Sequence, residues 1–206
     1  MIEFIIGTSL AASAGLNAWM PLFLLGLADR VLPAMALPSS WSWLSSDLSL
    51  WILGGLLLLE IVADKIPALD SVNDVIQSIL RPASGGIAFG AGSGAQTIAV
   101  DDPAAFFTDN TWVPVVVGIV IALIVHIVKA SARVAANTVT GGLAAPVLST
   151  AEDGASFALA AAAIIVPVLA AVLLVGLVVV VVVGLRRLAR RRRQNGSGQS
   201  AGRVQT

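Results

Sequence analysis

Residues 49–66, SLWILGGLLLLEIVADKI, decide the fold class of this chain. Their length approaches the roughly 20 apolar residues that an α-helix needs to cross a bilayer, yet Glu60, Asp64 and Lys65 lie among them. Lipid makes an unpaired charge in a spanning helix costly, by about 2.5–3.5 kcal/mol on insertion scales. These side chains therefore face other protein or water, and we expect several membrane helices to pack around them.

The composition of the whole chain agrees with this expectation. Of the 206 residues, 57% are hydrophobic and 12% are charged, whereas a soluble domain carries about 25% charged residues. The chain has no cysteine and one histidine, so a disulfide framework and a thiolate metal site are excluded. We expect an all-α, polytopic integral membrane helix bundle with no cofactor and no metal.

We predict a single transmembrane domain over residues 1–185, followed by a polybasic, disordered tail over 186–206. Six segments are expected to span the membrane: 3–28, 49–66, 82–100, 112–130, 133–150 and 156–185. The third and fifth segments are rich in Gly, Ala, Ser and Thr. Each of these two is either a full span or a broken, re-entrant segment that the others shield from lipid.

Lys and Arg set the expected orientation, because cytoplasmic connections are enriched in them. The connections 101–111 and 151–155 contain neither residue, whereas those after the second and fourth segments are basic. This alternation predicts that both termini are cytoplasmic. Tryptophans favour the membrane interface, and four are expected near the outer one: Trp41, Trp43, Trp51 and Trp112. The absence of tyrosine and the many Ala, Val, Gly and Arg residues suggest a bacterial inner membrane.

A cluster of arginines follows the sixth segment. It consists of Arg186, Arg187, Arg190, Arg191, Arg192 and Arg193. Such a run anchors the cytoplasmic end of a helix and attracts anionic lipid headgroups. In so hydrophobic a chain it is a weak indication of nucleic-acid binding, and we expect none.

Buried polar residues are the candidates for function. Glu60 and Asp64 share a helical face one turn apart, and a second apolar segment contains His126 and Lys129. Two amides lie beside expected helix irregularities: Asn17, before Pro21, and Asn137, before Pro146. Together with Lys65, these residues either line a substrate or ion pathway or form an ion-pair network that fixes the bundle. The sequence leaves both interpretations open.

The segment after Pro67 predicts a short interfacial helix over 71–80, with Asp70 as its N-cap and Arg81-Pro82 as its end. Asp70, Asn73 and Asp74 share a face near its start. Helix capping explains these three residues better than a cation site does.

Small residues predict close helix packing. Gly86, Gly90 and Gly94 recur every four residues, a spacing that lets helix backbones approach. The contact lies either within the bundle or in a homo-oligomer. The chain also contains a weak internal similarity, in which Glu60-Ile-Val and Ser84-Gly-Gly-Ile-Ala resemble His126-Ile-Val and Thr140-Gly-Gly-Leu-Ala. Internal repeats occur in transporters, but chance explains so short a match equally well.

Three stretches carry a resemblance to a known family: residues 13–22 (SAGLNAWMPL), 64–70 (DKIPALD) and 81–86 (RPASGG). They resemble a family of small bacterial and plant membrane proteins described as a domain of unknown function. The resemblance covers roughly residues 5–185 and implies a shared fold. It supplies no activity and no site residues.

The sequence leaves two candidate functions for this protein. The leading one is a transporter or channel-like protein for a small solute or ion. The alternative is a non-transporting scaffold or lipid-interacting protein with structural charges. An enzyme is not expected, because the sequence has no nucleophile elbow, no HExxH and no phosphate-binding Gly-Lys-Ser/Thr element.

Overall fold

The computed structural model describes residues 1–97, 99–100, 112–180, 182–183 and 186, and the side chains of these residues except 67–74. The described part is all-α, and its only extended pairing consists of two isolated bridges, Ala36 with Gln96 and Thr97 with Val100. The elements are α1 (Ile2–Leu16), α2 (Met20–Val31), the 3-10 helix η1 (Ser42–Ser45), α3 (Asp47–Ala63), α4 (Pro67–Ser93), α5 (Trp112–Thr140) and α6 (Ala145–Ile165). A further apolar helix, Pro167–Val180, follows α6.

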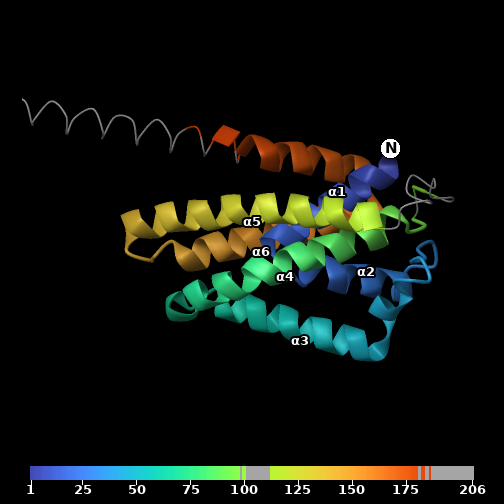
Figure 1. Ribbon diagram of the computed structural model, residues 1–206, viewed down its shortest axis with the longest axis horizontal. Helices are drawn as coiled ribbons and strands as arrows, with labels where there is room; N and C mark the ends of the chain where they lie inside the picture. The colour runs from blue at the N-terminus through green and yellow to red at the C-terminus, as the bar shows by residue number, and fades with distance from the viewer. Residues whose placement is uncertain (98, 101–111, 181, 184–185, 187–206) are drawn as a thin grey trace, which may run out of the picture.

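The first predicted segment, 3–28, is not one span. Asn17 adopts an extended backbone, with φ −143° and ψ 122°, and divides α1 from α2. The two helices form a hairpin that returns to the end of the bundle from which it came (Figure 1). The ring of Phe4, in α1, meets that of Phe89, near the end of α4, at 5.7 Å between centroids. Arg30, at the end of α2, pairs with Asp47, the first residue of α3.

The predicted interfacial helix 71–80 and the predicted third segment 82–100 are wrong as separate elements. α4 is a continuous helix of 27 residues that contains Pro82. An interior proline removes one backbone hydrogen bond, but neighbouring helices make this tolerable in a packed membrane helix. Asp70 is not the N-cap: the helix is preceded by Ile66 and starts with Pro67, whose missing N–H costs nothing at that position.

The side chains of Asp70, Asn73 and Asp74 lie outside the described ones. Their possible role in cation binding therefore stays a prediction. The predicted connection 101–111 and the tail after Arg186 are likewise outside the described residues.

The predicted boundary between the fourth and fifth segments is also wrong. α5 runs without interruption over 29 residues, Trp112–Thr140. The chain then turns at Gly141 and Gly142, whose φ angles of 61° and 89° favour glycine. Predicted segment 133–150 therefore supplies the end of α5 and the start of α6, and the predicted connection 151–155 lies inside α6.

The predicted sixth segment, 156–185, is divided in the same way as the first. α6 ends at Ile165, and Val166, with φ −139° and ψ 78°, separates it from the helix Pro167–Val180. The residue before a proline avoids helical angles, which explains the break. The second part of the internal sequence similarity has no structural counterpart, since Ser84-Gly-Gly is helical whereas Gly141-Gly142 forms a turn.

Small residues bring α4 and α5 into backbone contact. A Cβ atom added to Gly118 would lie 2.2 Å from the carbonyl oxygen of Gly85, and one added to Gly85 would lie 2.3 Å from the Cβ of Ala122. No real Cβ contact is that short. The two helices can therefore pack this closely only because both positions are glycine.

The predicted glycine stripe packs within the chain. A Cβ atom on Gly86 would lie 2.9 Å from Ile119, one on Gly90 3.1 Å from Trp41, and one on Gly94 2.9 Å from Pro38. The stripe is occupied by these intramolecular contacts. It therefore gives no argument for the expected homo-oligomer, which stays a prediction.

The exposed faces of the helices are apolar. On α5, Val120, Ile124 and Ile127 are each about half exposed. Two helices, α5 and α6, are long and apolar enough to cross a membrane. Large exposed apolar surfaces mark interaction sites, and here they surround an interior that contains buried charges. This distribution indicates membrane association.

Gly85→Ala should destabilise the bundle by about 1–3 kcal/mol, because the added methyl group has no room against α5. Gly55→Ala is the control, since a Cβ there meets nothing within 4 Å and alanine favours the helix by up to about 1 kcal/mol. The melting temperatures of both variants in detergent measure the effect. A Gly85→Ala protein that melts at or above the wild-type temperature would show that α4 and α5 do not pack as described.

Candidate functional site

The break between α1 and α2 lies inside the bundle, and it exposes backbone groups that a continuous helix would pair. The side chain of Asn17 caps the new helix: its Oδ1 accepts the N–H groups of Trp19, at 3.2 Å, and Met20, at 3.0 Å. Asn17 and Ala18 are fully buried, so no water reaches the remaining groups. Unpaired backbone groups in such a place cost several kcal/mol each, by order of magnitude.

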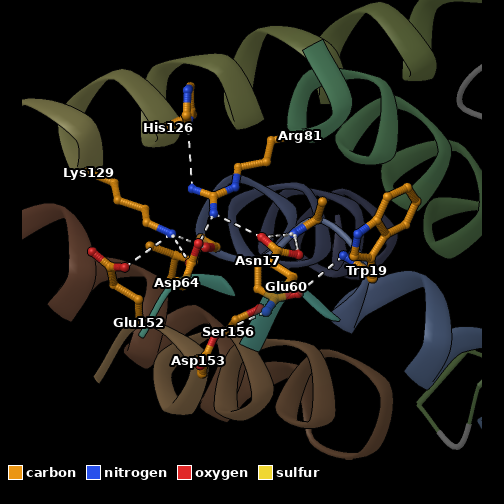
Figure 2. Close-up of polar contacts among 12 residues, drawn as sticks. Asn17, Trp19, Glu60, Asp64, Arg81, His126, Lys129, Glu152, Asp153 and Ser156 are labelled. Atoms are coloured by element: carbon orange, nitrogen blue, oxygen red, sulfur yellow. Dashed lines mark hydrogen bonds and ion pairs between the residues drawn. The ribbon is translucent and has the colours of Figure 1, made fainter. Parts of the chain in front are cut away.

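Three other helices supply partners for those groups (Figure 2). The Nζ of Lys129, on α5, donates to the carbonyl oxygen of Leu16 at 2.7 Å. The N–H of Ala18 donates to both carboxylate oxygens of Glu60, on α3, at 3.1 and 3.3 Å. The hydroxyl of Ser84, on α4, donates to the carbonyl oxygen of Ala18. The helix break thus depends on buried polar side chains from α3, α4 and α5.

Buried cations tie these partners together. Arg81 donates to Glu60 at 2.9 Å. One oxygen of Asp64, Oδ2, lies within ion-pair distance of three cations: Arg81 at 3.6 Å, Lys129 at 3.6 Å and Arg133 at 3.2 Å. The side chains of all five residues, two acids and three bases, are at most 2% exposed, so their charges are compensated by protein groups and not by solvent.

Helix α6 completes the network from the other side. Glu152 pairs with Lys129 at 3.1 Å and with Arg133 at 2.5 Å. Asp153 pairs with Lys65 at 3.2 Å and accepts from the amide of Asn17 at 3.0 Å. Figure 2 shows the carboxylates of α6 opposite Lys129 and the helix break.

The network contains both signs of charge and is graded in exposure. Among the described side chains, four carboxylates face four cations: Glu60, Asp64, Glu152 and Asp153 with Lys65, Arg81, Lys129 and Arg133. The side chains of Glu152 and Asp153 are 15% and 13% exposed, and that of Lys65 is 36% exposed. The α6 side of the network is therefore its more accessible side.

His126 extends the network through α5. Its Nδ1 lies 3.3 Å from Nη1 of Arg81, and its Nε2 lies 3.1 Å from the hydroxyl of Ser78. An arginine can only donate, so Nδ1 must accept and carries no proton. The geometry therefore assigns His126 as the neutral imidazole with its proton on Nε2.

The comparisons with known proteins give one result. The family model "Domain of unknown function (DUF4126)" matches residues 4–187. The chain belongs to this family. Neither the curated proteins nor the solved structures gave a match. The DUF4126 match confirms the family resemblance drawn from the sequence, and it includes the helix break and the whole charged network.

Most of the predicted pathway residues meet in this DUF4126 site. They are Asn17, Glu60, Asp64, Lys65, His126 and Lys129. Asn137 does not join them: it lies eight residues beyond Lys129 on α5, and its Oδ1 has no partner among the described residues. Arg186 is exposed, and the other tail arginines lie outside the described part. No three described His, Cys, Asp or Glu side chains are placed to hold a metal ion.

Sequence reasoning missed Arg81, Glu152 and Asp153: it assigned Arg81 to a helix boundary and the two acids to an outer connection. It placed Arg133 at a helix boundary too, but named it as one possible partner of the Glu60 and Asp64 carboxylates, and the structure pairs it with Asp64. One signal was available, because His126, Lys129 and Arg133 follow at intervals of three and four residues and so share one helical face. A single polar stripe of this kind on an apolar segment indicates that the helix continues through it.

Asn17→Ala should lower the free energy of unfolding by about 1–2 kcal/mol, since it removes the cap of α2 and the amide that binds Asp153. Asn137→Ala is the matched control, because that amide oxygen is unpartnered and should be dispensable. Thermal melts of the two purified variants measure the difference. Equal melting temperatures would mean that the Asn17 side chain does not stabilise the break.

His126 should be neutral at pH 7, with its proton on Nε2. It is the only histidine of the chain, so ¹⁵N labelling of histidine gives one pair of ring signals that report protonation and tautomer directly. Signals of an imidazolium, or of the tautomer protonated on Nδ1, would show that Arg81 does not donate to this ring.

Proposed function

We propose that this DUF4126 protein is a multi-pass transporter for a small solute or ion, located in a bacterial inner membrane. One observation carries the proposal: a discontinuous helix ends inside the bundle among ionisable side chains. Broken helices near the midplane form the substrate and ion sites of many transporters, where they offer helix ends and freed backbone groups. Ionisable residues at that depth are otherwise rare in membrane proteins.

The depth of the site supports the proposal. His126 lies 14 residues from either end of α5, Trp112–Thr140. At about 1.5 Å per residue, this places it roughly 20 Å from each end of the helix. A bilayer core is about 30 Å thick, so a helix centred in it would hold the network near the midplane.

The direction of the helices supports an orientation that differs from the one expected from sequence. The hairpin α1–α2 does not cross the bundle, because α2 ends beside the start of α3. The last apolar helix runs alongside α1, with Ala170 clustered with Ile6 and Leu177 with Leu16. Its far end therefore points away from the start of α1. With the arginine cluster cytoplasmic, the start of α1 lies on the outer side, and not on the cytoplasmic side.

A second candidate is a structural membrane protein with no transport activity. The observation that favours it is the pairing of the buried charges: Glu60, Asp64, Arg81, Lys129 and Arg133 each have at least one oppositely charged partner within 3.6 Å. In such a protein, the fully paired network would have a purely structural role, which is to hold the helices in place. The two candidates differ in whether the network ever opens.

Flux through purified protein in liposomes separates the two candidates. We expect the wild-type protein to move at least one member of a panel of small cations, anions and neutral solutes. Glu60→Gln should abolish that flux while the protein stays folded, because one side-chain oxygen remains to accept from Ala18. Asp47→Asn is the control on the same helix, since its carboxylate is 77% exposed and far from the break.

One result would oppose transport, and a second would remove Glu60 from the transport site. A wild-type protein that moves nothing on the panel would favour the structural candidate. A Glu60→Gln protein that melts earlier but carries unchanged flux would show that Glu60 only stabilises the bundle. If Glu60→Gln does not fold, Asp153→Asn replaces it, because Asp153 lies at the accessible side of the network. Its flux should fall while Asp47→Asn stays at the wild-type level.

A further inference from the structure

Glu152 differs from the other carboxylates of the network. Glu60 is fixed by the backbone of Ala18 and by Arg81. Asp64 pairs with three cations, and Asp153 also accepts from the amide of Asn17. Glu60 and Asp64 are also the most buried of the carboxylates. Both side chains are 1% exposed. Glu152 is 15% exposed, and its contacts are ion pairs and hydrogen bonds to two cations alone, Lys129 and Arg133. It is therefore the carboxylate that can leave at the smallest structural cost.

The two cations hold Glu152 in the way that proteins hold a free carboxylate. Arg133 donates from Nε to Oε1 and Oε2, at 3.2 and 3.0 Å, and from its terminal nitrogen Nη2 to Oε2, at 2.5 Å. This side-on, two-point geometry matches a planar carboxylate group. Lys129 adds a point charge at 3.1 Å. The side chain of Glu152 thus occupies a built site for one carboxylate anion.

Two buried groups beside this site have polar capacity that the fold does not use. The hydroxyl of Ser149, on the same helix and one turn before Glu152, is fully buried and has no hydrogen-bond partner among the described residues. The same holds for the Nε of Arg81, within the network itself. Buried donors are ordinarily paired. The two unpaired groups leave hydrogen-bonding capacity for a further acceptor.

Charge balance sets a condition on any exchange at this site. The described side chains of the network include four carboxylates and four cations, and an added uncompensated charge in such surroundings is strongly unfavourable. If an external anion displaces Glu152, one negative charge is added. The original net charge returns only if one carboxylate takes up a proton, and Glu152 is the one that has just lost its cations.

We propose that Lys129 and Arg133 bind the carboxylate of a small monocarboxylate anion in place of Glu152, and that Glu152 takes up one proton from solution as it leaves. The proposal rests on the transport function proposed above and names its substrate class. An O–H bond forms on Glu152, no bond of the anion breaks, and the network keeps its net charge. Transport through this site is therefore an electroneutral symport of one proton and one anion.

Lactate binding to the purified full chain in detergent tests the proposal. We use sodium lactate as the probe, and sodium chloride and sodium phosphate at equal ionic strength as comparison anions. Isothermal titration calorimetry in buffers of different ionisation enthalpy counts the protons taken up. We expect one proton taken up per lactate bound, and an affinity for lactate that falls as the pH is raised.

Three variants sharpen the test. Glu152→Gln has the shape of the protonated glutamate, so it should bind lactate at pH 7.5 at least tenfold more tightly than the wild type, with no pH dependence and no proton uptake. Arg133→Gln should lose binding, because it removes the side-on donor pair. Asp47→Asn, altered at an exposed acid, should behave as the wild type.

Several results would overturn the proposal: no lactate binding by the wild type, binding without proton uptake, stronger binding of phosphate or chloride, or an unchanged pH dependence in Glu152→Gln. If that variant does not fold, proton counting on the wild type still decides. Lactate binding without flux in liposomes would refute transport but keep the site. Flux of another solute without lactate binding would support the transport function but refute the carboxylate site.

Discussion

The fold depends on one constraint, which is that backbone groups inside a membrane protein must find partners. The interruption of α1–α2 at Asn17 frees a carbonyl group on Leu16 and both backbone groups of Ala18. A hydrogen bond to a charged group contributes about 1.5–3 kcal/mol, roughly what is needed to offset such a break. Lys129 and Glu60 supply two of these bonds. Their burial is therefore explained by the helix break, before any function is considered.

The buried charges of Lys129 and Glu60, which pair with the backbone at the helix break, create a second requirement. A buried lysine and a buried glutamate each need a counter-charge, because desolvation of a lone ion costs several kcal/mol even after relaxation. Arg81 and Asp64 meet part of this need, and each of them brings a new charge with the same need. The chain of pairing ends at Glu152, Asp153 and Lys65, where partial exposure to solvent relaxes the demand. The network thus has a fully buried inner part and a partly exposed outer part.

Sequence reasoning identified the all-α fold and the family correctly and misplaced several helix boundaries. Apolar runs predicted the all-α fold, and the positions of Glu60, Asp64 and His126 within them predicted an interior polar site, because the cost of a charge in lipid is a property of the residue. The breaks and continuations were not predictable in the same way. Pro82 lies inside a helix, whereas Pro167 follows a break. Which outcome a proline has depends on whether neighbouring side chains satisfy the freed groups, and that is a tertiary property.

Arg133 illustrates why the site was incomplete in the sequence. Taken locally, Lys129 and Arg133 resemble a basic connection at a membrane surface. In the structure they lie on a continuous helix, and their charges are cancelled by Asp64 from α3 and Glu152 from α6. Those two acids are 88 residues apart in the sequence (152 − 64 = 88). Composition cannot distinguish a cation at the surface from one that is neutralised at depth, because only the packing of α3, α5 and α6 brings the counter-charges together. The same packing leaves Glu152 bound to cations alone at the partly exposed side of the network, and this is why we place the proposed anion exchange on α6.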